Sequence, residues 1–254
     1  MLTDAELAQY HRDGYIVPDY RLPETILESI RDDHQRLVKR HPQFVDYCPT
    51  VLAYDTGFLA YARIPEIVDM VGQILGPDFA LWNSSLFAKP AFKGSKTPWH
   101  QDGEYWPIRP VATCTAWLAI DDSTPENGCL RVIKGSHKQG RLLKHLQNDG
   151  PGLALNQELD PSEYDEKDAV DIVLKAGQIS LHDVFLAHGS EPNRSPRSRR
   201  GLTLRYMPLT SVFDRELAKQ QVVSRNLRAG HADRTLFLIR GQDRTGRNDF
   251  QLRM

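Results

Sequence analysis

The feature that most constrains the fold is the succession of short strand-like segments that begins at Phe79. These segments are rich in β-branched and aromatic residues, and turn signals such as 125–128 and 175–178 separate them. Long helices do not alternate with the strands, so the pattern favours a sandwich or barrel over a βαβ sheet. Strands are predicted over residues 79–89, 113–120, 129–133, 170–174, 179–182 and 201–207.

The first 78 residues carry helix signals instead. Thr3 and Glu6 have the spacing of a capping box, so a short helix is expected up to residues 13–14. A brief β-segment should follow over 15–18. Apolar residues then recur with a period close to that of an α-helix over 23–40 and over 65–75, which predicts two amphipathic helices packed on the core. Residues 44–58 are irregular, and their aromatic side chains could lie over a pocket.

Together these patterns indicate one domain over residues 1–254, mainly β with flanking α-helices. We expect an N-terminal helical part (1–78), a β core (79–210) and a C-terminal cover (211–254). The polar stretch 140–168 is predicted to be an insertion between strands. The tail after Val212 is rich in Arg and Gln and is expected to form one or two helices that cover the barrel edge.

The amino-acid composition excludes some classes of binding partner. The formal net charge is −1, from 32 basic and 33 acidic residues, which gives no electrostatic footprint for nucleic acid or an anionic membrane. No apolar run approaches the length of a bilayer span, and the N-terminus lacks the features of a signal peptide. Cys48, Cys114 and Cys129 have no metal-type spacing, so buried free thiols are expected. We therefore predict a cytoplasmic protein with a small-molecule partner, and the oligomeric state stays open.

The first chemical signal is Trp99-His100-Gln101-Asp102. Residues i and i+2 of a strand point to the same face, so His100 and Asp102 can bind one ion while Gln101 faces away. Taken alone, His-x-Asp is a weak signal because it occurs by chance in many chains.

A second stretch, His188-Gly189-Ser190 and the Arg-rich segment after it, strengthens this signal. If the fold brings the two stretches together, His100, Asp102 and His188 offer two imidazoles and one carboxylate, the ligand set of a non-haem Fe(II) oxygenase. A dicarboxylate co-substrate would leave such a site with one net negative charge. One arginine would restore neutrality and bind a carboxylate through two parallel hydrogen bonds.

Further motifs accompany these two stretches. The matching residues are Trp99-His100-Gln101-Asp102, Trp117, Asn127-Gly128-Cys129-Leu130, Gly135-Ser136-His137-Lys138, His188-Gly189-Ser190 with Asn193 and Arg199, and Arg205-Tyr206. In this combination the chain resembles the phytanoyl-CoA dioxygenase family of Fe(II)/2-oxoglutarate-dependent oxygenases, over most of the chain from about residue 79 to residue 208. The resemblance implies a double-stranded β-helix, a cupin-like jelly roll whose mouth holds the metal.

The resemblance also implies that His100, Asp102 and His188 bind iron. Related halogenases have a small residue in place of the aspartate, so that chloride can bind the metal there. The carboxylate of Asp102 therefore favours hydroxylation or another oxidation. His182 is the competitor of His188 for the third ligand position, although the Gly-Ser pair that the family has follows His188.

For the co-substrate, the resemblance implies that Arg199 pairs with the distal carboxylate of 2-oxoglutarate. Arg200 is its rival, and the spacing from His188 favours Arg199. Further co-substrate contacts are expected from Ser190 and Trp117 and, by a looser match, from Ser85 and Lys89.

Residues near these motifs are expected to line the substrate mouth, although each of them could equally be structural. They are Trp82, Asn83, Tyr105, Trp106, Arg109 and Arg205. An Arg109 or Arg205 that faces the iron would suit an anionic substrate.

The sequence thus predicts an oxygenase with Fe(II), 2-oxoglutarate and O2 that hydroxylates a small organic molecule and releases succinate and CO2. The same chemistry could end in desaturation, cyclisation or epimerisation. A jelly-roll protein that binds a metal without redox chemistry is the alternative from another class.

Overall fold

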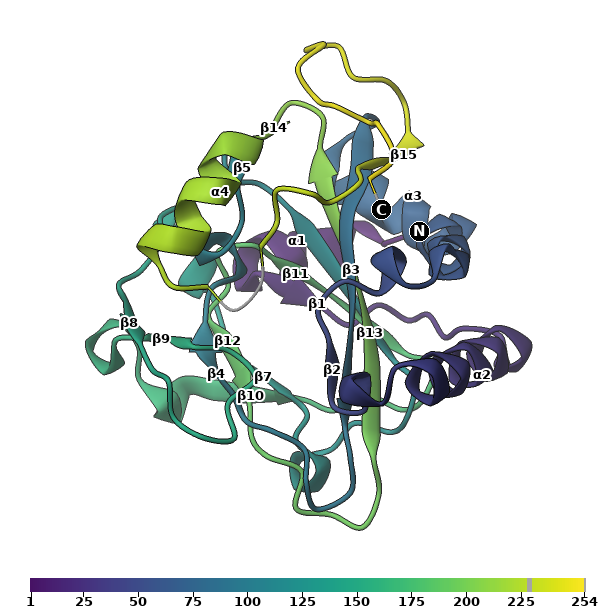
Figure 1. Ribbon diagram of the computed structural model, residues 1–254, viewed down its shortest axis with the longest axis vertical. Coiled ribbons are helices and arrows are strands. Elements are labelled where there is room, and N and C mark those ends of the chain that lie inside the picture. Colours follow the sequence, from purple (N-terminus) through teal and green to yellow (C-terminus); the bar gives the residue numbers. More distant parts are fainter. Residues whose placement is uncertain (228–229, 254) are drawn as a thin grey trace.

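The computed structural model describes residues 1–227 and 230–253. Two antiparallel sheets form a double-stranded β-helix, which confirms the predicted fold (Figure 1). The larger sheet has the strand order β1-β11-β6-β13-β3-β15, and β2 also pairs with β3. Its strands are β1 (Tyr15–Ile16), β2 (Tyr47–Cys48), β3 (Phe79–Lys89), β6 (Cys114–Ala119), β11 (Ile179–Asp183), β13 (Arg199–Pro208) and β15 (Phe237–Arg240).

The smaller sheet has the strand order β10-β7-β12-β4. Its strands are β4 (Thr97–His100), β7 (Leu130–Ile133), β10 (Ala169–Ile172) and β12 (His188–Ser190). β4 and β12 are absent from the strands predicted above, because both are short and polar and lack an alternating apolar pattern. Trp117 of the larger sheet packs in one cluster with Val132 and Ile172 of the smaller one, so the two inner faces meet.

Strand β13 lies at the centre of the larger sheet between β3 and β6. Thr203 is opposite Ser85 on one side and opposite Trp117 on the other. Successive side chains of a strand point to opposite faces. Leu202 and Leu204 are accordingly fully buried in the core cluster shared with the N-terminal helices, whereas Thr203 lines an internal cavity.

Three helices lie in the N-terminal part of the chain, before β3: α1 (Asp4–Asp13), α2 (Glu24–Arg40) and α3 (Pro65–Leu75). The predicted capping box is confirmed, since the Thr3 hydroxyl accepts from the Glu6 N–H at 3.2 Å while the Glu6 carboxylate accepts from the Thr3 N–H at 2.8 Å. α2 and α3 cover the outer face of the larger sheet (Figure 1). The side chains of Leu27 and Ile30 on α2 are fully buried there, so the apolar period read from the sequence is the packing face.

Short 3-10 helices connect the longer elements. They are η1 (Pro42–Phe44), η2 (Val51–Ala53), η3 (Thr56–Arg63), η4 (Asp102–Glu104), η5 (Pro125–Asn127), η6 (Ser136–Gln139), η7 (Pro161–Glu163) and η8 (Glu166–Asp168).

The insertion and the C-terminal tail contain strands that sequence periodicity did not predict. Within 140–168, β8 (His145–Gln147) pairs with β9 (Gln157–Leu159). In the tail, β14 (Val212–Phe213) pairs with β5 (Ile108–Arg109), and one helix follows, α4 (Arg215–Ser224). β15 then pairs with the edge of β3 and satisfies backbone groups that would otherwise be open. Residues 228, 229 and 254 of the predicted cover lie outside the described residues.

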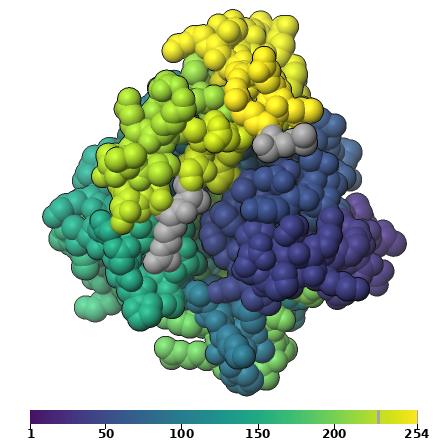
Figure 2. Space-filling model, in the orientation of Figure 1, coloured from purple at the N-terminus to yellow at the C-terminus, as the bar shows by residue number. Residues whose placement is uncertain are grey.

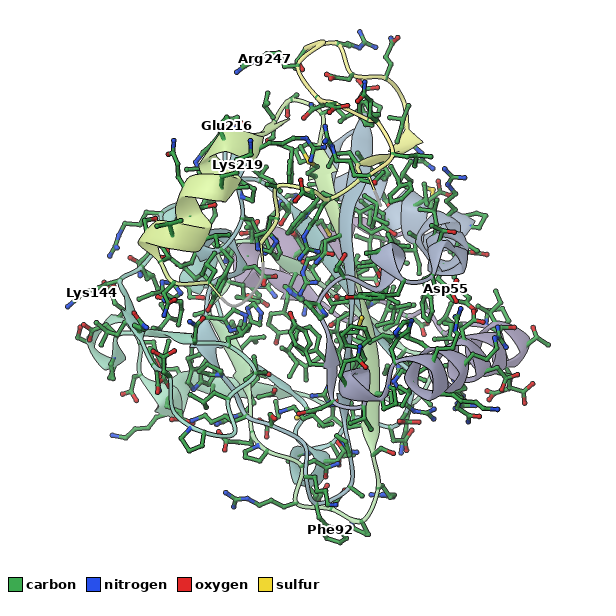
Figure 3. The ribbon with its side chains drawn as sticks, in the orientation of Figure 1. Asp55, Phe92, Lys144, Glu216, Lys219 and Arg247 are labelled. Atoms are coloured by element: carbon green, nitrogen blue, oxygen red, sulfur yellow. The ribbon has the colours of Figure 1, made fainter. Side chains whose placement is uncertain are left out.

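The N-terminal part, the insertion and the C-terminal tail meet on one face of the molecule (Figure 2). Side chains fill the space between the sheets, whereas the labelled Lys144, Glu216 and Phe92 lie at the periphery (Figure 3). The three cysteines are free and buried, as expected. Among the described helices, none combines the length and the apolar character that crossing a bilayer requires.

Candidate active site

Two neighbouring strands of the smaller sheet bring the predicted metal ligands together. His188, the first residue of β12, is the direct partner of His100, the last residue of β4, and their ring centroids lie 4.1 Å apart. Asp102 belongs to η4, so the prediction that His100 and Asp102 share a strand is wrong. Between them, the Gln101 side chain donates to the Phe185 carbonyl at 2.7 Å and accepts from the Leu143 N–H at 2.6 Å.

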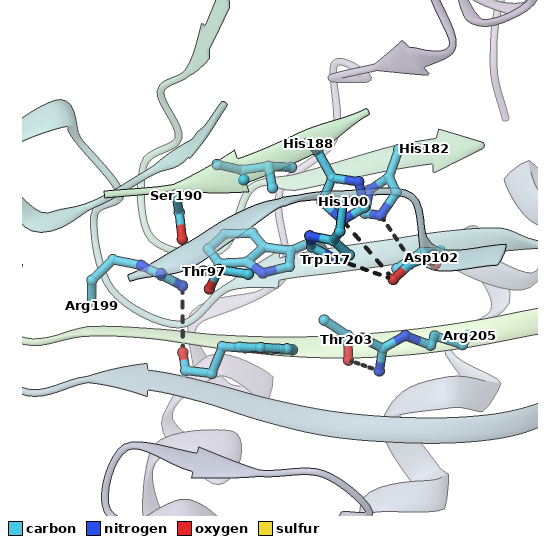
Figure 4. A pocket seen from close by; sticks show the side chains of 14 residues that line it. Thr97, His100, Asp102, Trp117, His182, His188, Ser190, Arg199, Thr203 and Arg205 are labelled. Carbon is cyan, nitrogen blue, oxygen red and sulfur yellow. Dashed lines mark hydrogen bonds and ion pairs between the residues drawn. The ribbon is translucent and has the colours of Figure 1, made fainter. Parts of the chain in front are cut away.

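The ligand atoms of these three residues converge (Figure 4). The Nε2 atoms of His100 and His188 lie 3.7 and 4.0 Å from Oδ1 of Asp102, and one ligand atom of each residue lies within 4.8 Å of the others. Each histidine holds Nδ1 2.8 Å from a backbone carbonyl, that of Pro98 or Leu186. A carbonyl accepts a proton, so Nδ1 carries the hydrogen and Nε2 presents its lone pair to a metal.

Electrostatics keep these groups in their ligating forms. Burial, and next the neighbouring His100, hold the pKa of His188 well below its usual range, so its imidazole is neutral. Burial alone would raise the pKa of Asp102, but the adjacent imidazoles of His100 and His182, and next that of His188, outweigh it, and the pKa lies well below its usual range. The neutral His188 and the ionised Asp102 converge with the His100 imidazole, and this donor set of two imidazoles and one carboxylate fits Fe(II).

His182, on β11, lies beside the same aspartate. Its Nε2 is 3.6 Å from Oδ2 of Asp102, whereas His100 and His188 approach Oδ1. The three-residue group that can hold a metal, among the described residues, is His100, Asp102 and His188. His182 is thus placed to orient the carboxylate rather than to replace His188.

A cavity extends from the metal ligands to Arg199, which is 3% exposed. No carboxylate of the described residues pairs with Arg199: its Nη1 donates to the Phe87 carbonyl at 3.4 Å, its Nε lacks a partner, and its guanidinium lies over the Trp117 ring at 5.2 Å. Burial lowers its pKa to about 10, so it is cationic at neutral pH. The rival Arg200 instead makes two 2.8 Å hydrogen bonds to the Asp121 carboxylate.

Of the other co-substrate residues predicted, Ser190 and Trp117 line this cavity (Figure 4). Lys89 and Ser85 do not lie in its wall. The Lys89 ammonium donates to the carbonyls of Ser190 and Glu191, and the Ser85 hydroxyl donates to the Pro49 carbonyl at 2.9 Å.

A second cavity shares His100 and Asp102 with the first and opens between the N-terminal part, the insertion and the tail. Four of the predicted substrate residues line it: Asn83, Tyr105, Trp106 and Arg205. Trp82 packs behind Trp106, with ring centroids 4.7 Å apart, and lies outside this wall. Arg109 also lies outside it and donates to the carbonyls of Trp106 and Ile108 at 3.1 and 2.7 Å.

The lining residues that the sequence did not single out include Tyr47, His231 and Arg234. Tyr47 belongs to the irregular aromatic segment expected over a pocket, which is confirmed. The polar surroundings of His231 in the sequence favour a solvated residue, but its side chain is only 9% exposed. Arg234 lies in the tail among many arginines, and no motif distinguishes it from them.

A double-stranded β-helix with two histidines and an aspartate at its mouth, beside a buried unpaired arginine, defines the class of iron- and 2-oxoglutarate-dependent oxygenases. The family model described as Phytanoyl-CoA dioxygenase (PhyH) matches residues 10–201. The chain belongs to this family, which confirms the predicted resemblance.

Similarity to individual relatives and solved structures supports this family assignment. Phytanoyl-CoA dioxygenase, peroxisomal, of Bos taurus is 32% identical over 223 residues, which are 78% of this chain and 66% of the relative. A solved non-heme monooxygenase, the ThoJ-Ni complex, is 25% identical with a TM-score of 0.70 over 97% of this chain and 88% of the other. The epimerase SnoN in complex with Fe3+, alpha ketoglutarate and nogalamycin RO shares the fold, at 21% identity and a TM-score of 0.67 over 83% and 85% of the two chains. The chain spans 41% to 68% of the length of four curated relatives.

Proposed function

We propose that this protein is an Fe(II)/2-oxoglutarate-dependent dioxygenase that hydroxylates a C–H bond of a small organic molecule. The observation that carries the proposal is the convergence of the His100, Asp102 and His188 ligand atoms within 4.8 Å, in a cavity that also contains the unpaired Arg199. Bound iron supplies the oxidation, in which one atom of O2 enters the product and the other enters succinate as 2-oxoglutarate loses CO2.

The residues of the chain position the reactants. His100 and His188 would hold iron through Nε2, and the carbonyls of Pro98 and Leu186 fix their rings. The Arg199 guanidinium donates two parallel hydrogen bonds to the distal carboxylate of 2-oxoglutarate. This carboxylate replaces the water that burial has removed from the guanidinium.

Two neutral groups complete the pocket for the co-substrate. Ser190 and Trp117 form the walls beside Arg199, and the Trp117 ring packs against the guanidinium. Asp102 occupies the position that a halide would need, so hydroxylation is proposed rather than halogenation.

A direct test is succinate formation that requires Fe(II), 2-oxoglutarate and an organic substrate together. Before a substrate is known, anaerobic addition of Fe(II) and 2-oxoglutarate should give a weak visible charge-transfer band. A protein that binds Zn(II) and gives no band with Fe(II) and 2-oxoglutarate would be a non-redox metal binder, and the proposal would fail. A cytoplasmic location stays a prediction from the sequence.

A further inference from the structure

The second cavity contains a pair of arginines to which the function proposed above assigns no role, although one of them, Arg205, also lines the first cavity. His100 and Asp102 lie at one end, and Arg205 and Arg234 line the same cavity. Arg205 comes from β13 and Arg234 from the tail, and both lie beyond residues 10–201, the part of the chain that the family model matches.

Arg205 is 7% exposed and has only neutral partners among the described residues. Its Nη1 donates to the hydroxyls of Ser85 and Thr203 at 2.7 and 2.8 Å, and its Nε is buried without a partner. The guanidinium lies over the Trp106 ring at 5.3 Å. Its charge is therefore buried without a counter-ion.

Arg234 is likewise a buried arginine without a counter-ion among the described residues, and it is 8% exposed. Its Nε donates to Nδ1 of His231 at 2.9 Å, and its Nη1 donates to the Pro49 carbonyl at 3.2 Å and to the Asn83 side-chain oxygen. No carboxylate of the described residues pairs with it. Burial lowers its pKa to about 10, and the guanidinium is still charged at neutral pH.

One chain of neutral groups joins the two cations. The Asn83 amide accepts from Arg234 and donates to the Ser85 hydroxyl at 3.2 Å, and Ser85 in turn accepts from Arg205. Two positive charges are thus fixed near one another. The free-energy cost of removing water from both guanidinium groups is offset only by neutral hydrogen-bonding groups. A ligand with negative charge would remove this cost.

A count of charges leads to the same conclusion. Fe(II) and Arg199 together carry as much positive charge as Asp102 and 2-oxoglutarate carry negative charge. The metal and co-substrate are therefore already neutral as a set, and Arg205 and Arg234 leave two positive charges for the substrate to meet.

The rest of this cavity is largely apolar. Its wall includes Trp106, Phe87, Leu155 and Leu227. Such a wall suits a hydrocarbon or aromatic body, and the metal ligands at the near end face whatever part of that body lies opposite the arginines.

We propose that the substrate is a small organic anion with an apolar body, whose carboxylate or phosphonate Arg234 and Arg205 bind together. This inference rests on the proposed oxygenase function and specifies its substrate class. His231 acts as a positioning residue, because its acceptor Nδ1 fixes the fork of Arg234. The oxidised C–H bond then lies in the apolar body, away from the anionic group.

The first experiment measures binding without any variant. The protein is loaded anaerobically with Fe(II) and saturating 2-oxoglutarate and is titrated in a calorimeter with 3-phenylpropanoate, its methyl ester, 3-phenylpropylphosphonate and 3-phenylpropylamine. We expect the acid or the phosphonate to bind at least tenfold more tightly than the ester and the amine. Equal affinities, or an acid whose affinity falls as 2-oxoglutarate is raised, would overturn the inference.

Two arginine variants then locate the site. Arg234→Gln should remove the preference for the anion over the ester, and Arg234→Lys should restore part of it because the charge returns without the planar fork. Arg109→Gln is the matched control, since that guanidinium lies outside the cavity wall, and it should keep the full preference. An Arg234→Gln protein with the wild-type preference would contradict the proposal.

The visible charge-transfer band separates the two proposals. If the wild-type protein shows the band but no anion preference, the oxygenase function stands and the substrate class is wrong. If it shows no band, the oxygenase function fails, whatever the titrations give.

Discussion

Two adjacent arginines on β13 face opposite sides of the larger sheet and have opposite surroundings. Arg200, on the outer face, forms a bidentate ion pair with Asp121. Arg199, on the inner face, is more deeply buried, yet no carboxylate of the described residues pairs with it. The two arginines differ in the source of the counter-ion. The chain itself supplies a carboxylate to Arg200 on the outer face, whereas a ligand must supply one to Arg199 on the inner face.

This comparison shows why burial alone does not identify a functional residue. A buried charge with a partner is compatible with a purely structural role, although its net contribution to stability is small. A buried charge without a partner lowers stability and is explained by binding. On this criterion the inner face of the larger sheet, with Arg199 and Arg205, is the functional one.

The largest effect is expected from the loss of one of the proposed metal ligands. His100→Ala removes one of the metal ligands, so iron affinity and succinate formation should fall by more than about 100-fold, beyond what loss of a residue supporting a ligand costs. Metal content and succinate release measure the two effects. The control is His11→Ala, an exposed histidine on α1, which should behave as wild type. Full turnover by His100→Ala would exclude it as a ligand.

The two arginines can be compared directly. Arg199→Gln should raise the KM for 2-oxoglutarate by about 50-fold, because loss of a buried charged contact costs about 2 kcal/mol or more. Arg200→Gln should leave that KM unchanged and should lower the free energy of unfolding by about 1 kcal/mol through the loss of the Asp121 pair. Initial rates against 2-oxoglutarate and urea unfolding separate the two. A raised KM in Arg200→Gln alone would reverse the assignment.

A smaller effect should distinguish His182 from His188. His182→Ala leaves all three proposed ligands in place but frees Oδ2 of Asp102, so iron affinity should fall by about tenfold. His188→Ala should abolish iron binding at the same metal concentration. Competition with a chelator gives both affinities. If His182→Ala has the larger effect, His182 is the ligand.

The sequence allowed the metal ligands and Arg199 to be predicted, because they stand in motifs that resemble those of the family. It did not predict Arg234, since only the tertiary fold shows which arginine of the tail is buried beside the cavity. The ligand strands β4 and β12 were missed for a related reason: their residues are selected for chemistry, so the apolar alternation that marks a strand is absent. Asp102 still meets His100, although through a turn rather than through strand parity.

The smallest expected effect concerns the outer face, where His34 of α2 lies near Arg200. Burial, and next the Arg200 charge, lower the pKa of His34 from 6.5 to about 4. The unfolded chain therefore binds more protons between these values, and the contribution of neutral His34 to stability is fully present above pH 6.5 and is lost as the pH falls towards 4. Between pH 7 and pH 5.5 the loss should be about 1 kcal/mol.

Urea unfolding of the wild type and of His34→Gln at both pH values measures this contribution, because all other titrating groups are common to the two proteins. The difference between their unfolding free energies should change by about 1 kcal/mol in favour of the variant as the pH falls. Arg200→Gln should reduce the change, since removing the nearby cation allows the pKa of His34 to rise. A difference that is independent of pH would show that His34 titrates alike in the folded and unfolded chains, and that the outer face does not hold it neutral.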